Sequence, residues 1–381
     1  MMDNQGSFYR GGARVLDGTA AVRQVDRKDC EIRVAGAPIP GIRRIILVRD
    51  ESTEDLVSSL PAISAVRETY PGAWLGLLTR PGLVSLARMA SDIDELLVPT
   101  GTVDGMEQAF RRFRPDLLIS MSRSSKVAWA AWRAKIPHRI GTGFRLYSPL
   151  FTGRVDERRR AGRCHEVDYA LSFAHRVGAP VAPARFPLEV PGEAGDGVGN
   201  WLDLHQVSRP FVVIHPGAGA GCPTWPAVHF VQLATLLEAE STRVVFSMGE
   251  GDREFVTALE DDHPFLRRLP RFEGGSEARA ALFSMSAVTV GNGASAVHLA
   301  SALGVPTLTL HAPWRSCGYR RRGPYAANGW ALVAESEEAK GWSPRRRRAL
   351  GSQLLSAVTP ADARRCVVAM MAGREPELGL S

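Results

Sequence analysis

The sequence predicts an α/β protein with two doubly wound domains, each built on a parallel sheet. Short, continuously apolar runs rich in β-branched residues alternate with helical patterns along most of the 381 residues. Such runs are typical of parallel strands that are buried on both faces, and their alternation with helices indicates βαβ units. The alternation stops at residues 180–199, which are rich in Pro and Gly, and resumes at residue 211. This interruption predicts a linker between two similar halves.

The first half is expected to begin at residues 43–48, whose apolar, β-branched run predicts a buried strand. The elements expected after it are strands at 73–78, 95–98 and 116–120, and helices at 56–69, 83–90, 106–113, 126–134 and 165–178. Residues 141–163 interrupt the rhythm because they are rich in Gly, Arg and aromatic residues. Residues 1–40 are polar and Gly-rich, so they are expected either to add an edge strand, through the alternating stretch at 31–34, or to stay mobile.

The second half repeats the pattern and ends in one more helix. The elements expected are strands at 211–214, 243–246, 287–290 and 307–310, and helices at 228–239, 252–259, 277–285, 295–302 and 359–371. The chain is therefore divided into an N-terminal extension (1–40), a first domain (41–185), a linker (186–206), a second domain (207–345) and a helical tail (346–381).

Charge and cysteine content exclude several classes of protein. The 47 Lys+Arg exceed the 40 Asp+Glu by a modest margin, and no basic stripe with interleaved aromatic residues is present, so nucleic-acid binding is not expected. The five cysteines are far apart and include no CxxC pair, which predicts free thiols rather than disulfides or a metal site. No apolar run approaches the roughly 18 residues of a membrane span, and the N-terminus lacks the apolar core of a signal peptide. We therefore expect a cytoplasmic protein.

Ligands bind to open α/β sheets at the carboxyl ends of the strands, so the turns after strands are the candidate sites. The turn at residues 49–55 carries Asp50, Glu51, Glu54 and Asp55 at the start of a helix. Carboxylates at this position often stabilise the helix N-terminus. Alternatively, one of them is a general base whose pKa is tuned by crowding and partial burial.

Three later turns could bind an anion. The loop at 215–222 is Gly-rich, and the segment at 291–298 places small residues at a helix start, so both offer free backbone amides. Neither loop matches the GxGxxG fingerprint or the GxxxxGK[ST] phosphate loop. The loop at 311–325 contains several arginines, whose guanidinium groups suit diphosphate recognition, although a solvated basic surface is the simpler interpretation for most of them.

Motifs along residues 42–335 resemble, in order, the bacterial heptosyltransferases of lipopolysaccharide core synthesis, which form glycosyltransferase family nine. The matching segments are IILVRDESTEDLVSSLPAISAVRETYPGAWLGLLTRPG, RPDLLIS, RIGTGF, HEVDYAL, HPGAGAGCPTWPAVHFVQLA, VVFSMGEGDRE and VGNGASAVHLASALGVPTLTL. The resemblance implies a GT-B fold, in which two Rossmann-like domains face an interdomain cleft. It implies an acceptor site in the first domain, a nucleotide-sugar site in the second, and an inverting transfer that needs no metal ion.

The resemblance also implies roles for particular residues. Alignment on Leu60-Pro61-Ala62 places the catalytic base at Asp55. The donor diphosphate is expected to lie on the amides of two loops and beside one arginine, namely Ala218, Gly219, Ala220, Gly221, Ala294, Ser295, Ala296 and Arg315. Asp252 or Glu254 is expected at the ribose. Further candidates for the cleft are Glu54, His298 and Arg320.

Three positions depart from the family pattern. The family has a lysine one or two residues before the tryptophan that corresponds to Trp225, and this chain has none there. Gly293 stands where the family has an aspartate, and Glu54 stands where it has a glycine. The missing lysine removes a charge-assisted contact with the diphosphate, for which Arg315 or one of Arg320–Arg322 could substitute. The departures leave three alternatives: another nucleotide sugar, altered contacts with ADP-heptose, or loss of transfer.

We therefore expect a glycosyltransferase that uses a nucleotide sugar, ADP-linked by family resemblance, as co-substrate and needs no other cofactor. The expected acceptor is a glycan, a glycolipid or a small molecule, presented at the inner face of the membrane if it is a lipid. Arginines 345–348 leave room for peripheral contact with anionic lipid. The alternative function is a noncatalytic sugar-nucleotide-binding or scaffold protein on the same fold.

Overall fold

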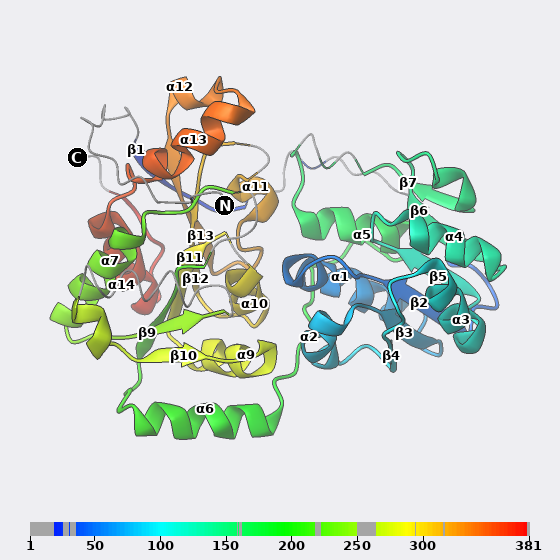
Figure 1. Ribbon diagram of the computed structural model, residues 1–381, viewed down its shortest axis with the longest axis horizontal. Helices are drawn as coiled ribbons and strands as arrows, with labels where there is room; N and C mark the ends of the chain where they lie inside the picture. Colours follow the sequence, from blue (N-terminus) through cyan, green and yellow to red (C-terminus); the bar gives the residue numbers. More distant parts are fainter. Residues whose placement is uncertain are drawn as a thin grey trace, which may run out of the picture.

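The protein folds into two α/β lobes, which lie side by side in a computed structural model (Figure 1). The structure describes residues 19–25, 30, 36–157, 159, 162–217, 222–249, 264–293, 295–314 and 317–378. Among these residues, no helix is both long enough and apolar enough to cross a membrane.

The N-terminal lobe is built on a six-stranded, fully parallel sheet in the order β4-β3-β2-β5-β6-β7. Its strands are β2 (Arg44–Val48), β3 (Trp74–Leu78), β4 (Glu95–Leu97), β5 (Leu117–Ser120), β6 (His138–Thr142) and β7 (Gly153–Val155). The first four lie where the apolar runs predicted them. The last two were not predicted, because neither β6 nor β7 is a continuously apolar run; β6 overlaps the interrupting segment only at residues 141–142, and β7 lies within it.

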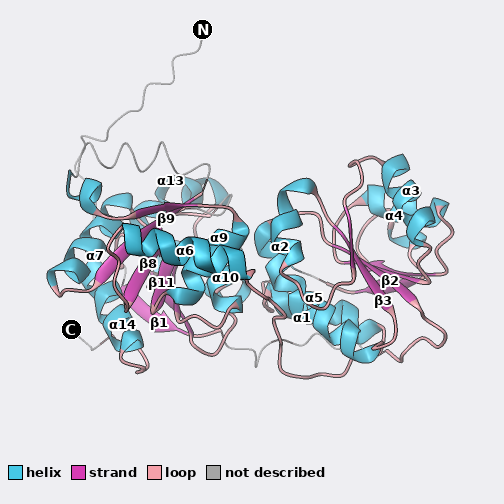
Figure 2. Cartoon of the chain, turned by 90° about the horizontal axis from the view of Figure 1, so that it is seen from below, coloured by secondary structure: helices cyan, strands magenta, loops and turns pink. Residues whose placement is uncertain are grey.

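Helices cover both faces of this sheet (Figure 2). They are α1 (Thr53–Thr69), α2 (Val84–Arg88), α3 (Val103–Phe113), α4 (Ser125–Arg133) and α5 (Glu166–Arg176), with short 3-10 turns at Pro81–Leu83 and Ser148–Leu150. Side chains of β2 alternate between the faces: Ile45 and Leu47 join the core with α1 and α5, whereas Ile46 and Val48 join the core with α3 and α4. This alternation explains why the strand is apolar throughout.

The C-terminal lobe is built on a seven-stranded sheet in the order β1-β13-β12-β11-β8-β9-β10. Its strands are β1 (Thr19–Arg23), β8 (Phe211–His215), β9 (Arg243–Met248), β10 (Arg271–Glu273), β11 (Val288–Asn292), β12 (Thr307–His311) and β13 (Gly329–Glu335). All pairs are parallel except β1, which pairs antiparallel with β13. The N-terminal extension thus supplies an edge strand at 19–23, whereas the stretch at 31–34 lies outside the described residues.

The helices of this lobe are α6 (Gly192–Leu204), α7 (Ala227–Ala239), α9 (Ser276–Met285), α10 (Ser295–Ala302), α11 (Tyr319–Arg322), α12 (Glu337–Lys340), α13 (Pro344–Leu355) and α14 (Pro360–Met371), with a 3-10 turn at Pro264–Arg268. The helix expected at 252–259 lies outside the described residues. Helix α6 occupies most of the expected linker. Its buried Val198 and Leu202 stand four residues apart and α6 packs against α9, so tertiary burial offsets a Gly-rich composition.

The lobes meet through helices that follow their first strands. Helix α1 packs against α10, and α2 packs against α9. One apolar cluster runs through both lobes and includes Leu56 and Leu60 of α1 together with Leu299 of α10. The carboxyl ends of β2 and β11, which precede α1 and α10, therefore lie at the same interdomain boundary.

The cysteine prediction is wrong, because four of the five cysteines form disulfides. Cys30 pairs with Cys164 and Cys222 pairs with Cys317, with Cα atoms 4.9 and 5.7 Å apart. The partners are 134 and 95 residues apart in the chain, so only the fold brings them together. Cys366 is free and buried.

Candidate active site

The turn between β2 and α1 holds an ion pair between Arg49 and Asp55. Arg49 is 1% exposed, and its Nη2 lies 2.9 Å from Asp55 Oδ1. The same guanidinium donates to the backbone oxygens of Asp55 and Met121 and lies 2.9 Å from Glu51. A buried cation at the end of the central strand thus orients the first turn of α1.

Asp55 does not itself cap the helix, because Ser52 does. The amide of Asp55 donates to Ser52 Oγ at 3.1 Å, and the Ser52 hydroxyl donates to Asp55 Oδ2 at 2.6 Å. The Asp55 side chain remains 21% exposed, and each of its oxygens keeps a lone pair for a further donor. Asp55 is thus bonded to the N-cap residue of α1 and ion-paired to Arg49, with its carboxylate partly exposed.

Glu54 points toward the other lobe. Its carboxylate lies 3.5 Å from Arg322 Nη1 and 3.6 Å from His298 Nε2, and both partners belong to the C-terminal lobe. Burial, helped by the neighbouring charges of Asp55 and Glu166, raises the pKa of Glu54 to about 7, although Arg322 opposes the shift. Glu54 is thus a carboxyl group near its titration midpoint at the boundary between the lobes.

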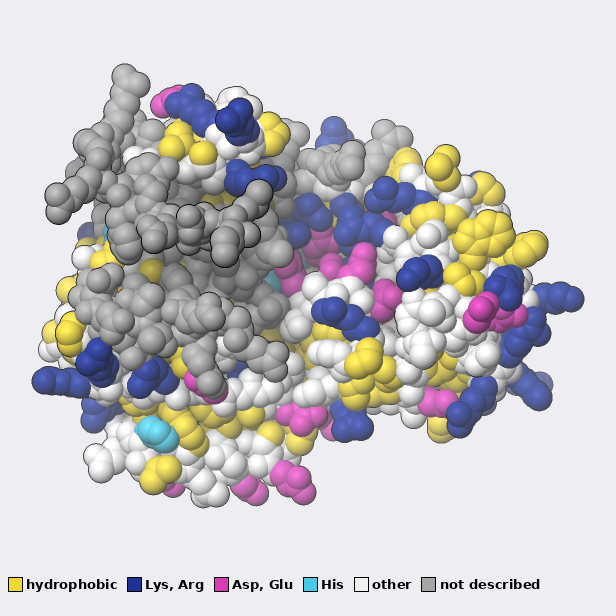
Figure 3. Space-filling view, in the orientation of Figure 1, with side chains coloured by type: hydrophobic (Ala, Val, Ile, Leu, Met, Phe, Trp, Pro, Cys, Tyr) yellow, Lys and Arg dark blue, Asp and Glu magenta, His cyan; other side chains and the backbone are white. Residues whose placement is uncertain are grey.

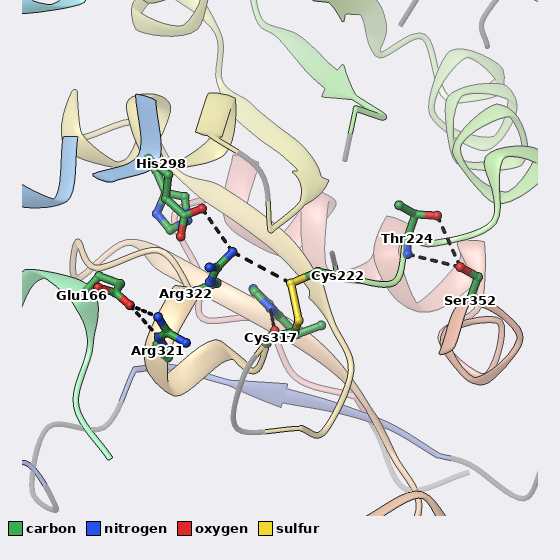
Figure 4. The surroundings of a disulfide bond; sticks show 10 residues. Glu166, Cys222, Thr224, His298, Cys317, Arg321, Arg322 and Ser352 are labelled. Atoms are coloured by element: carbon green, nitrogen blue, oxygen red, sulfur yellow. Dashed lines mark hydrogen bonds and ion pairs between the residues drawn. A yellow bond between two sulfur atoms is a disulfide. The ribbon is translucent and has the colours of Figure 1, made fainter. Parts of the chain in front are cut away.

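A second carboxylate, Glu166 at the start of α5, is fully committed to ion pairs. Its two oxygens lie 2.9 Å from Arg159 Nη1 and 2.5 Å from Arg321 Nη2. Burial alone would raise the pKa of Glu166, but the two guanidinium groups outweigh it and lower this pKa to about 2. Glu157 also pairs with Arg159. The Glu166–Arg321 pair therefore joins α5 of one lobe to α11 of the other (Figure 4).

Further polar contacts join the start of α5 to the segment after α11. His165 Nε2 donates to the Gly323 carbonyl at 2.9 Å, and Tyr325 Oη donates to Asp168 at 2.8 Å. Burial lowers the pKa values of His165 and His298 to about 4, so both rings are neutral at pH 7. Acidic and basic side chains gather at the hollow between the lobes (Figure 3).

The side-chain amide of Asn292, at the end of β11, makes two hydrogen bonds to the backbone of the segment that follows β8. Its Nδ2 donates to the Pro216 carbonyl, and its Oδ1 accepts from the Trp225 amide, both at 2.8 Å. Trp225 is itself buried and donates from its ring to Val358. Asn292 therefore fixes both ends of the Gly-rich segment at 217–224.

The glycine at position 293 has a steric reason. A Cβ atom there would lie 2.6 Å from Cε1 of His311. The His311 ring is held between the Cys317 carbonyl and the Thr309 hydroxyl, each at 3.0 Å. The aspartate of the family pattern would collide with this ring, so the departure at Gly293 belongs with His311.

The structure brings together some of the expected site residues. Asp55, Glu54 and His298 meet at the interdomain boundary, and Ala296 is buried in the first turn of α10. Arg320 is exposed, whereas Arg321 and Arg322 beside it contact the first lobe. Of Ser295 the structure describes only the backbone, in the first turn of α10. The remaining expected donor residues lie outside the described residues: Ala218, Gly219, Ala220, Gly221, Asp252, Glu254, Ala294 and Arg315.

Sequence reasoning missed Arg49, Glu166 and Asn292 as parts of the site. Arg49 could have been found, because it directly follows the central strand in the turn already selected for its carboxylates. Glu166 gives no local signal, since its partners come from two other segments. Among the described residues, no three His, Cys, Asp or Glu side chains form a group that could hold a metal ion.

Two Rossmann-like lobes that meet at a charged boundary beside their strand ends define a GT-B fold. The chain belongs to glycosyltransferase family 9, the heptosyltransferase family, whose model matches residues 105–342. It is therefore a glycosyltransferase with a heptosyltransferase-like structure.

Solved structures agree with this assignment at the level of fold. A family 9 glycosyltransferase from Veillonella parvula superposes with a TM-score of 0.74 at 17% identity, over 87% of this chain and 97% of that chain. The E. coli ADP-heptose lps heptosyltransferase II gives 0.66 at 19% identity, over 82% and 98%. The E. coli heptosyltransferase WaaC with ADP gives 0.64 at 16% identity, over 86% and 99%.

Proposed function

We propose that this glycosyltransferase transfers a sugar, with heptose as the first candidate, from an ADP-linked donor to an acceptor hydroxyl or amine, with inversion and without a metal ion. The observation that carries this proposal is the Asp55 carboxylate, which Arg49 and Ser52 orient at the interdomain boundary while 21% of the side chain stays exposed. The E. coli relative solved with ADP supports the choice of nucleotide.

In the proposed reaction Asp55 accepts the proton of the acceptor hydroxyl. The acceptor oxygen forms a bond to the anomeric carbon while the bond from that carbon to the diphosphate oxygen breaks. The nucleoside diphosphate leaves with the electron pair. A single displacement of this kind inverts the anomeric centre, and the base contributes about 10²–10⁴-fold to the rate.

The rest of the proposed donor site follows from the sequence. The amides of 218–221 and 294–296 would bind the diphosphate, and Asp252 or Glu254 would bind the ribose. A lipopolysaccharide-core acceptor follows from the family, and it would bring the enzyme into peripheral contact with the cytoplasmic face of a membrane.

The test compares Asp55→Asn with the wild type in two assays, ADP binding by calorimetry and ADP release from ADP-heptose with a panel of core-type acceptors. We expect Asp55→Asn to bind ADP normally and to lose about 10²–10⁴-fold in turnover. Asp50→Asn, in the same turn, is the matched control and keeps its activity. NMR of the product gives the anomeric configuration, and turnover in EDTA tests metal independence. Unchanged turnover of Asp55→Asn at full donor occupancy would remove Asp55 as the base.

A further inference from the structure

The two loops proposed for the donor diphosphate carry no cationic side chain of their own. No Lys or Arg occurs between residues 216 and 242, nor between 288 and 314. A diphosphate bound there would be left with backbone amides alone unless a cation reached it from another segment. The short helix α11, which follows β12 in the chain, carries three arginines, Arg320, Arg321 and Arg322.

The three arginines of α11 differ in their surroundings. Arg320 is exposed, and Arg321 is held 2.5 Å from the buried Glu166. Arg322 has only looser contacts: its Nη1 lies 3.5 Å from Glu54 and 4.0 Å from Cys222 Sγ. Its Nε is buried and, within the described part of the chain, has no hydrogen-bond partner.

Arg322 also lies where the donor is expected. Cys222 directly follows the loop at 218–221, and His298, which shares Glu54 with Arg322, belongs to α10. Figure 4 shows Arg322 between the Cys222–Cys317 disulfide and His298. The Arg322 guanidinium thus contacts the residue that follows the first proposed loop and shares Glu54 with the helix that carries the second, and its buried Nε has no hydrogen-bond partner among the described residues.

We propose that Arg322 is the cation that binds the donor diphosphate. In the empty enzyme Arg322 pairs with Glu54, and it turns away from Glu54 to the diphosphate when the donor enters. This inference rests on the proposed function. It links two departures from the family pattern, the missing lysine before Trp225 and the glutamate at position 54.

Glu54 is suited to this exchange. Its 3.5 Å separation from Arg322 is longer than the roughly 2.7–2.9 Å of a strong charged hydrogen bond, so little is lost when the pair opens. The raised pKa of Glu54, which burial causes, lets the carboxyl group take up a proton near pH 7 once Arg322 has turned away. Protonation also removes its repulsion toward an incoming diphosphate.

The experiment measures ADP binding by calorimetry and adenosine binding by ligand-observed NMR titration, on the full chain at pH 7.5. We expect Arg322→Met to weaken ADP binding about 10–100-fold and to leave adenosine binding unchanged, because only ADP carries the diphosphate. Glu54→Gln should bind ADP several-fold more tightly than the wild type. Arg345→Met, an exposed arginine of α13, is the matched control and keeps both affinities.

Equal ADP affinities of Arg322→Met and the wild type would overturn the inference, as would an equal loss of ADP and adenosine binding, which indicates a structural role. A loss in Arg315→Met without one in Arg322→Met would assign the cation to Arg315 instead. If Arg322→Met does not fold, Arg322→Gln decides: we expect ADP binding about 10–100-fold weaker than wild type with adenosine binding unchanged, and unchanged ADP binding overturns the inference. If the wild type binds none of ADP, GDP and UDP, the proposed function fails first.

Discussion

Arg49 and Asp55, which flank the turn between β2 and the first residues of α1, form an ion pair with 2.9 Å between Arg49 Nη2 and Asp55 Oδ1. The arginine side chain is 1% exposed and the aspartate side chain 21%. The arginine is thus a fixed part of the N-terminal lobe, and the carboxylate is the part that reaches the boundary. This arrangement orients the carboxylate of the proposed base without enclosing it.

Replacement of Arg49 should therefore affect turnover more than donor binding. We expect Arg49→Met to lower kcat about 10–100-fold, to leave the Kd for ADP within about twofold, and to lower the free energy of unfolding by roughly 1–3 kcal/mol, because the Met121 carbonyl loses its charged donor. Arg49→Lys should recover part of kcat. Steady-state kinetics and denaturant unfolding measure these changes, with the exposed Arg43→Met as control. An equal loss in Arg43→Met would show that the effect is not specific to the ion pair.

Glu54 should make stability depend on pH. Its folded pKa of about 7 lies above the ordinary value of 4.5, because burial disfavours the charged form. The stabilising contribution is full below about pH 4.5 and is lost as pH rises through 7. The groups that face Glu54 are Arg322 of α11, His298 of α10, Asp55 of α1, and His165 and Glu166 at the start of α5.

Glu54→Gln, which resembles the protonated form, isolates this contribution. Between about pH 4.5 and 7, we expect the free energy of unfolding of the wild type to fall relative to that of Glu54→Gln, by on the order of 3 kcal/mol at most. Above pH 7 the two stability curves should run parallel. Thermal unfolding of both proteins over pH 4.5–8 measures the difference. Parallel curves over the whole range would show that Glu54 titrates normally.

The Cys222–Cys317 disulfide should support donor binding. It joins the chain after β8 to the loop before α11, next to Arg322. We expect the double variant Cys222→Ser/Cys317→Ser to lose about 2–4 kcal/mol of stability and to bind ADP at least several-fold more weakly, because both flanking segments gain freedom. Intact mass after alkylation without reduction first establishes the pairing.

The control for this prediction is the other disulfide. Cys30→Ser/Cys164→Ser removes a bond of similar sequence span but keeps the link beside Arg322. It should lower the melting temperature and leave the Kd for ADP within about twofold. An equal weakening of ADP binding in both double variants would contradict a local role for Cys222–Cys317.

Prediction from the sequence succeeded where local patterns carry the information. The apolar runs at 43–48 and 211–214 correspond to β2 and β8. Both strands are buried on both faces, so nearly every residue in them is apolar and the run is visible in the sequence. It failed where burial is supplied by distant segments. Helix α6 has a Gly-rich composition and is stabilised by its contact with α9. An edge strand from the N-terminal extension was one of the two expected outcomes, but its position at Thr19–Arg23 is set by pairing with β13.

The same division holds for the site. The sequence by itself determined the two-domain α/β plan, the acidic turn that holds Asp55, and the absence of a cation in the Gly-rich loops, because each depends on neighbours in the chain. Only the tertiary structure decided that four cysteines pair and that Arg322 rather than Arg320 meets Glu54. These depend on distances between segments up to 268 residues apart, which no local pattern encodes.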